Sequence, residues 1–131
     1  MKIFIGQRVT GEDIGKLKEE VRGIYEVLRK LGHEHYCTFM EGEEFEEGTA
    51  AEKMRAAFNK LNSYDTFLAV VRSESRSEGL LMEIGHVISS GKKLILAINK
   101  DVKDTYLREL ADEIIEFESP EDLLIKLENQ L

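Results

Sequence analysis

Cysteine, proline and tryptophan are scarce in this chain of 131 residues, which holds one cysteine, one proline and no tryptophan. The single cysteine, Cys37, excludes a disulfide within the chain, so a reducing cytoplasm is the expected location. The first residues, MKIFI, lack the longer apolar region and cleavage site of a signal peptide and fit a first strand. No apolar run approaches the roughly 20 residues that a membrane-spanning helix needs, so no membrane partner is expected.

Basic residues are outnumbered by acidic ones. The chain has 18 lysines and arginines against 26 aspartates and glutamates, a formal net charge of −8. A protein that follows the phosphates of a nucleic acid needs a basic surface, so a nucleic-acid polymer is not an expected partner. Binding of a small anionic ligand stays open as an alternative, because a few well-placed hydrogen-bond donors are enough to hold it.

The fingerprints of common nucleotide-binding loops are also missing. Neither GxxxxGK[ST] nor GxGxxG follows the first apolar run. Their absence disfavours a nucleoside triphosphatase and an ordinary dinucleotide enzyme, and no cofactor is expected. Receiver domains, another parallel α/β class, require an acidic pair after strand one and an Asp at the end of strand three. Gly6-Gln7-Arg8 and Arg72-Ser73 stand at those places.

The chain contains a regular alternation of apolar strand-like runs and amphipathic helices, the pattern of a parallel sheet built from βαβ units. Strands are expected near residues 1–5, 34–39, 66–72, 93–98 and 113–117. Helix starts are signalled by Thr10 and Asp13, by Thr49 with Glu52, by Ser77, and by Ser119 with Pro120. We expect one domain over residues 1–131, an α/β fold with a doubly wound five-stranded parallel sheet in a flavodoxin-like, Rossmann-like order.

The segment SEGLLMEIG, residues 77–85, places a carboxylate where open α/β sheets bind ligands, at the carboxyl end of a parallel strand. Apolar residues of its helix repeat at helical spacing: Leu80, Ile84, Val87 and Ile88. This stripe leaves Glu83 on another face. A solvated carboxylate stabilised by the helix dipole is the alternative, but it fits Glu78 better, because dipole effects fade beyond the first turn. Glu83 is therefore the candidate catalytic residue.

The loop RSESRS, residues 72–77, precedes that helix. Its hydroxyl groups, the guanidinium groups of Arg72 and Arg76, and the amides of the helix start could hold a phosphate or a sugar. The alternative is a solvated loop in which Ser77 only caps the helix, and both interpretations stay open.

His33, His35 and Cys37 alternate, so a strand would direct all three to one face, where such a trio could bind zinc. Their spacing is not that of a known zinc finger, and the strand lies near a sheet edge. No metal is therefore expected.

The segment YDTFLAVVRSESRSEGLLMEIGHVISSGKKLILAI resembles the core of the nucleoside 2-deoxyribosyltransferase superfamily, nearest to the 2′-deoxynucleoside 5′-monophosphate N-hydrolases. The likeness extends to IFIGQRVTGED at the start, and its specific part is Asp65, the pattern S-x-G-x-x-x-E-x-G and G-K before strand four. It implies that Glu83 is the nucleophile that attacks C1′ of the deoxyribose, and that Ser77 binds the phosphate. It also implies a homodimer or higher homo-oligomer, with contacts near Phe58 and Met82.

The chain departs from that family at three positions. Ala57 stands where the family usually carries a second active-site Asp, and Ile3 and Gln7 replace a Tyr and a Ser. Loss of the second carboxylate affects protonation of the leaving group or orientation of the nucleophile. The candidate replacements for this carboxylate follow strand two: they are Glu41, Glu43 and Glu44. A run of acids is, however, also typical of a solvated surface.

The sequence thus predicts an N-glycosidase or deoxyribosyltransferase-like enzyme that acts without a cofactor on a nucleoside or a 5′-monophosphate. Glu83 is its predicted catalytic residue. Substrate contacts are expected from Gly6, Gln7, Arg72, Arg76, Ser77 and Gly79. Two alternatives stay open: a nucleotide-binding module of the same fold that has lost turnover, and a plain interaction domain.

Overall fold

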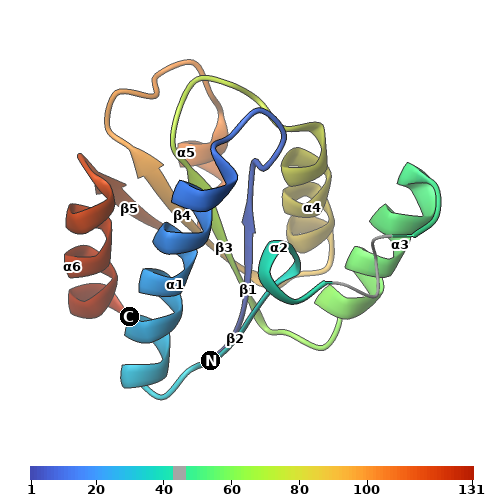
Figure 1. Cartoon of the computed structure of the whole chain (residues 1–131), viewed down its shortest axis with the longest axis horizontal. Helices are drawn as coiled ribbons and strands as arrows, with labels where there is room; N and C mark the ends of the chain where they lie inside the picture. The colour runs from blue at the N-terminus through green and yellow to red at the C-terminus, as the bar shows by residue number, and fades with distance from the viewer. Residues whose placement is uncertain (43–46) are drawn as a thin grey trace.

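The computed structural model describes residues 1–42 and 47–131. Its elements are β1 (Lys2–Gln7), α1 (Ile14–Lys30), β2 (Glu34–Cys37), α2 (Thr38–Glu41), α3 (Ala50–Leu61), β3 (Thr66–Val71), α4 (Glu78–Ser89), β4 (Lys93–Asn99), α5 (Leu107–Leu110), β5 (Glu113–Phe117) and α6 (Pro120–Gln130). The five strands form one sheet in the order β2-β1-β3-β4-β5, and every neighbouring pair is parallel (Figure 1). The predicted α/β fold with a flavodoxin-like strand order is confirmed. Within the described ranges, no helix has the length and apolar character needed to cross a membrane.

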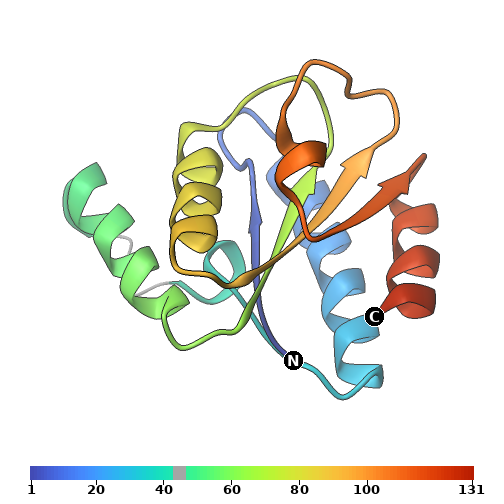
Figure 2. The same ribbon diagram turned by 180° about the vertical axis from the view of Figure 1, so that it is seen from behind.

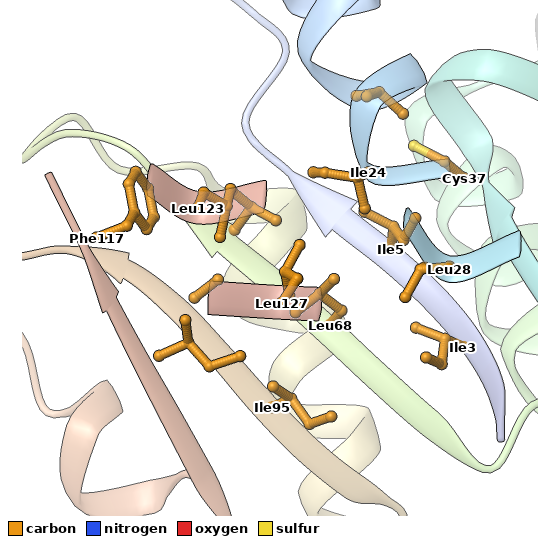
Figure 3. Packing of buried hydrophobic residues seen from close by; sticks show 14 of the residues in the cluster. Ile3, Ile5, Ile24, Leu28, Cys37, Leu68, Ile95, Phe117, Leu123 and Leu127 are labelled. Atoms are coloured by element: carbon orange, nitrogen blue, oxygen red, sulfur yellow. The ribbon is translucent and has the colours of Figure 1, made fainter. Parts of the chain in front are cut away.

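Helices cover both faces of the sheet, as Figures 1 and 2 show from opposite sides. On one face, α1 and α6 pack on alternate strand residues that include Ile5, Leu68 and Ile95 (Figure 3). On the other face, α4 and α5 pack on residues that include Phe4 and Phe67. Because successive strand side chains point to opposite faces and both faces are covered, the strands read as continuous apolar runs.

The helix starts follow the sequence signals. Side-chain caps accept hydrogen bonds from backbone N–H groups at four helices: Asp13 for α1, Thr49 for α3, Ser77 for α4 and Ser119 for α6. At α3 the predicted capping box with Glu52 is complete. Asp13, not Thr10, is the cap of α1.

Two short helices, α2 and α5, are not predicted by the apolar periodicity. Each has four residues, too few for a helical repeat to be visible in the sequence. Helix α2 also ends β2 at Cys37, two residues before the predicted boundary at Phe39. Since β2 is an edge strand that pairs with β1 alone, no second neighbour extends it.

Gly6 permits a close contact inside the sheet. A methyl group at this position would lie 2.2 Å from Cζ of Phe67, closer than carbon atoms approach without displacement. We expect Gly6→Ala to lower the free energy of unfolding by about 1–3 kcal/mol, the usual cost of overpacking. Urea denaturation measures the change.

The matched control is Gly85→Ala in the middle of α4, where an added methyl group meets nothing within 4 Å. This substitution is expected to raise the free energy of unfolding by about 0.5–1 kcal/mol, because alanine loses less backbone entropy in a helix. Equal stability of the Gly6→Ala and native proteins would contradict the packing argument.

Candidate functional site at the carboxyl edge of the sheet

The strand order creates a switch point between β1 and β3. The chain leaves β1 toward β2 on one side and leaves β3 toward β4 on the other. Open parallel sheets bind ligands in the crevice outside the carboxyl ends of two such strands. Gly6 and Gln7 end β1 there, Arg72 follows β3, and α4 begins after the cap Ser77.

Glu83 lies in the second turn of α4, beside the buried Ile84. Its side chain is half-buried, and no hydrogen bond or ion pair joins it to another described residue. Burial raises the pKa of this carboxyl group to about 7. Its charge also helps raise the pKa of Cys37 to about 11, although burial of that thiol is the larger cause. Glu83 therefore acts electrostatically on the carboxyl end of β2 as well.

Ser77 and Gly79 form the start of α4. The Ser77 hydroxyl accepts a hydrogen bond from the backbone N–H of Leu80 at 3.2 Å. A hydroxyl that accepts can still donate its own proton, so this cap is compatible with a ligand contact. At Gly79, an added methyl group would only make an ordinary contact of 3.9 Å with Ser77 Oγ. The ligand-binding roles of both residues stay predictions.

The two loop arginines have partners within the chain. Arg72 turns to the face that α1 covers, where its Nε lies 2.6 Å from Glu20 Oε2 and its Nη1 donates to Gln7 Oε1 at 2.8 Å. Arg76 donates to the backbone oxygen and the carboxylate of Asp104, at 3.0 and 3.1 Å. The Arg76 pair is exposed, and exposed ion pairs stabilise by only about 0–1 kcal/mol, so an anionic ligand can displace it. Arg72 is held more firmly.

Two cavities with described linings open at this edge. One, of about 60 Å³, is bordered by the whole loop 72–77 and has apolar walls from Leu80, Val102 and Leu107. The other, of about 380 Å³, lies between the starts of α1 and α6, with Phe117 in its lining. Arg72 and Ser73 line both cavities, and Glu83 lines neither. The loop residues and Glu83 thus occupy different parts of the carboxyl edge.

No second carboxylate stands at the family position on α3. Ala57 is buried there, and the next residue, Phe58, stacks its ring on His86 of α4 at 4.7 Å. Among the candidate replacements, Glu41 accepts a hydrogen bond from Tyr25 Oη at 2.6 Å. Glu43 and Glu44 lie outside the described residues.

Asp65, part of the sequence resemblance, lies at the amino ends of the strands, away from the candidate site at their carboxyl ends. Its two carboxylate oxygens each accept from the backbone N–H of Lys2 at 3.2 Å, and the Thr66 hydroxyl donates to it at 2.6 Å. These bonds, with Thr66 the larger cause, lower the pKa of Asp65. Asp65 therefore joins the starts of β1 and β3.

The three residues that could bind zinc, His33, His35 and Cys37, make other contacts. Cys37 is buried and accepts a hydrogen bond from Gln7, while the His35 ring packs on the Tyr25 ring, tilted by 58° at a centroid distance of 4.3 Å. His33 lies 3.0 Å from the terminal amine of Met1. In the part of the chain that the structure describes, no three His, Cys, Asp or Glu side chains are grouped to hold a metal.

Sequence reasoning missed Glu20 and the network it supports. Glu20 is largely buried against Arg72 although 52 positions separate them in the chain. The phase of α1 places Glu20 beside the stripe of Leu17 and Ile24, but nothing in the sequence indicates Arg72 as its partner. A tertiary ion pair of this kind leaves no periodic signal. Only the fold brings these residues together.

No protein-family model and no curated protein sequence matches the chain. Several solved structures are similar to it. The CMP N-glycosidase BcmB of Clostridium botulinum superimposes with a TM-score of 0.76 at 18% identity, covering 100% of both chains. The 2-deoxyribosyltransferase of Bacillus psychrosaccharolyticus superimposes with a TM-score of 0.66 at 17% identity, covering 95% of this chain and 90% of the other.

A conserved protein of Enterococcus faecalis V583 superimposes with a TM-score of 0.67 at 13% identity, covering 99% of this chain and 98% of the other. Identities this low establish a shared fold and no more. The fold that the resemblance in the sequence implies is thus confirmed: the chain has a nucleoside deoxyribosyltransferase-like fold.

Proposed function

We propose that this protein cleaves the N-glycosidic bond of a nucleoside or a nucleoside 5′-monophosphate, with Glu83 as the nucleophile and no cofactor. The observation that carries the proposal is the state of Glu83. It is a half-buried carboxylate on α4, the helix that follows β3, without an ion-pair partner among the described residues. A carboxylate kept in such surroundings costs free energy, and perturbed groups of this kind concentrate at functional sites.

The start of α4 supports a phosphorylated substrate. Ser77 caps the helix and Glu83 follows six residues later, about 9 Å further along the axis at a rise of 1.5 Å per residue. A sugar 5′-phosphate can extend along such a span, with its phosphate at the positive end of the helix and its anomeric carbon near Glu83. Arg76 adds a guanidinium group that Asp104 holds only weakly.

The reaction has two steps. The Glu83 carboxylate forms an ester bond to C1′ as the bond from C1′ to the base nitrogen breaks, and the base leaves with that electron pair and takes a proton. Water then adds its oxygen to C1′ and releases one proton, which balances the proton taken by the base, and the ester breaks to restore the carboxylate. If another base takes the place of water, the same intermediate yields transfer.

The second candidate is a nucleotide-binding module that has lost turnover. Ala57 favours it, because an apolar residue occupies the family position of the second active-site Asp. In that case the site holds its ligand but does not assist the departure of the base.

Incubation with a panel of nucleosides and monophosphates, followed by chromatography for free base, tests the proposal. CMP belongs in the panel because one similar structure is a CMP N-glycosidase. Release of base from any member supports the enzyme. Saturable binding of a monophosphate without release supports the binding module. If the protein neither releases base nor binds a monophosphate, only the interaction domain remains.

The rate is expected to rise with pH between about 6 and 8. The nucleophile must be ionised, and burial raises the pKa of Glu83 to about 7. An ordinary glutamate, with a pKa near 4.5, would give a flat profile in this range. The profile of kcat/KM measures the free enzyme when the substrate does not titrate, so it is recorded with a nucleoside, because a phosphate monoester loses its second proton at about pH 6. Glu78→Gln, which removes an exposed carboxylate of the same helix, should leave the shape of this profile unchanged.

A homodimer or higher homo-oligomer is also expected. Met82 is about half exposed on α4, and α3 packs outside α4 with Phe58 only partly covered. Apolar groups on adjoining helices are suited to contact with a second copy. Light scattering at micromolar concentration should give at least twice the 15.0 kDa mass, and a monomer mass would contradict this expectation.

A further inference from the structure

A buried polar network crosses the carboxyl ends of three strands on the face that α1 covers. Gln7 ends β1, Cys37 ends β2 and Arg72 follows β3. Gln7 Nε2 donates to Cys37 Sγ at 3.3 Å, and Arg72 Nη1 donates to Gln7 Oε1 at 2.8 Å. Figure 3 shows Cys37 near Ile5 and Ile24 on this face. Because Gln7 and Cys37 are both buried, water competes little for these hydrogen bonds.

Glu20 of α1 holds the guanidinium group at the end of this network. Arg72 Nε lies 2.6 Å from Glu20 Oε2, and the two side chains are 17% and 13% exposed. The neighbouring pair of Glu19 and Arg22 is 73% and 56% exposed. Low exposure strengthens the first pair and makes its separation costly, since one buried charge would then lack its partner. Arg72 is therefore fixed in place.

The chemistry of arginine determines which way the Gln7 carboxamide faces. Arginine only donates hydrogen bonds, so the oxygen of Gln7 must face Arg72 and its NH₂ group must face Cys37. Cys37 takes one of the two N–H groups, and the described residues supply no acceptor for the other. Gln7 stands next to Gly6 at the switch point of the sheet. A ligand that reaches Gln7 therefore meets an N–H group without a partner among the described residues, whereas Arg72 already uses one of the two lone pairs of the oxygen.

We infer that Arg72 and Glu20 are positioning residues, which act on the ligand through Gln7 by fixing its carboxamide as a hydrogen-bond donor. The group that Gln7 recognises is then an acceptor oxygen of the sugar or the phosphate. The inference rests on the proposed function and gives Arg72 a supporting role in place of direct ligand contact.

The test replaces both ends of the pair, Glu20→Gln with Arg72→Met, so that neither leaves an unpaired buried charge. The matched control replaces the exposed pair of the same helix, Glu19→Gln with Arg22→Met. In ¹⁵N-labelled protein, nuclear Overhauser contacts from the Gln7 side-chain N–H groups to Cys37 are expected in the native and control proteins and lost in the pair variant. Contacts retained in the pair variant overturn the inference. Arg72→Lys is the second variant, because one ammonium group cannot span Glu20 and Gln7 together.

Kinetics show whether the two residues act through Gln7. The pair variant is expected to lose about 10-fold in kcat/KM, the order of one hydrogen bond. In a Gln7→Met background the same replacement should cause no further loss, whereas an independent structural role would give additive losses. Additive losses overturn the inference. If the native protein releases no base and binds no monophosphate, the proposed function fails, and the orientation of Gln7 is still decided by the nuclear Overhauser contacts.

Discussion

Glu83→Gln is expected to abolish the release of free base while the fold and nucleotide binding persist. Glutamine matches glutamate in size but cannot form the ester with C1′. The rate of base release should fall by at least about 10²–10⁴-fold, the contribution of a positioned proton-transfer group, because this substitution removes a covalent step. Chromatography of the reaction mixture, with the best substrate of the panel, measures it.

The same variant measures how much the buried charge of Glu83 lowers the free energy of unfolding. In the native fold the pKa of Glu83 is raised from 4.5 to about 7. Its protonated form therefore contributes stability that is fully present below pH 4.5 and is lost as pH rises to about 7. Glutamine carries no charge, so Glu83→Gln should become the more stable protein over this range. Urea denaturation at several pH values measures the difference.

Glu78→Gln is the matched control, since it removes a carboxylate from the same helix at an exposed position. It should keep native activity and lose only about 0.3–1 kcal/mol of stability, independent of the pH between about 5 and 8, because Glu78 lies in the first turn of α4. Equal base release from the native and Glu83→Gln proteins would exclude Glu83 as the nucleophile. A Glu83→Gln protein that fails to bind monophosphate would instead place Glu83 in substrate binding.

The sheet could be predicted because its signals are local. β3 and β4 are continuous apolar runs, and helix starts such as Ser77 carry their own capping side chains. The position of Glu83 follows from the phase of one helix, in which Ile84 and Val87 point inward. Together with the rule that ligands bind at carboxyl strand ends, this phase locates the candidate nucleophile.

The partners of the loop arginines could not be predicted in the same way. Arg72 has one partner on α1 and another at the end of β1, and Arg76 has its partner in the loop after β4. Such contacts depend on the fold and not on spacing in the sequence. Asp65 gives the converse case: a residue of the sequence resemblance whose contacts, to Lys2 and Thr66, lie at the edge opposite the candidate site.

Ala57→Asp is expected to raise the rate of base release by up to about 10²–10⁴-fold, the usual contribution of a positioned general acid. Ala57 is 7% exposed on α3, beside the ring of Phe58 that stacks on α4. A carboxyl group placed there is desolvated, which raises its pKa and keeps it protonated near neutral pH. A protonated acid on α3, which packs on the helix that carries Glu83, can supply the proton that the departing base needs when α3 directs it into the site. The rate is measured at pH 7 with the best substrate of the panel.

Ala57→Asn is the control, because asparagine has the shape of aspartate but no acidic proton. It should leave the rate unchanged, and both variants should lose some stability, since each buries a polar group. Ala57→Asp combined with Glu83→Gln should be inactive, as the acid assists departure only when the nucleophile attacks. Equal rates for the Asp, Asn and native proteins would contradict a role for this position. If only Ala57→Asp turns over, the native protein is the binding module and the missing carboxylate accounts for its lost activity.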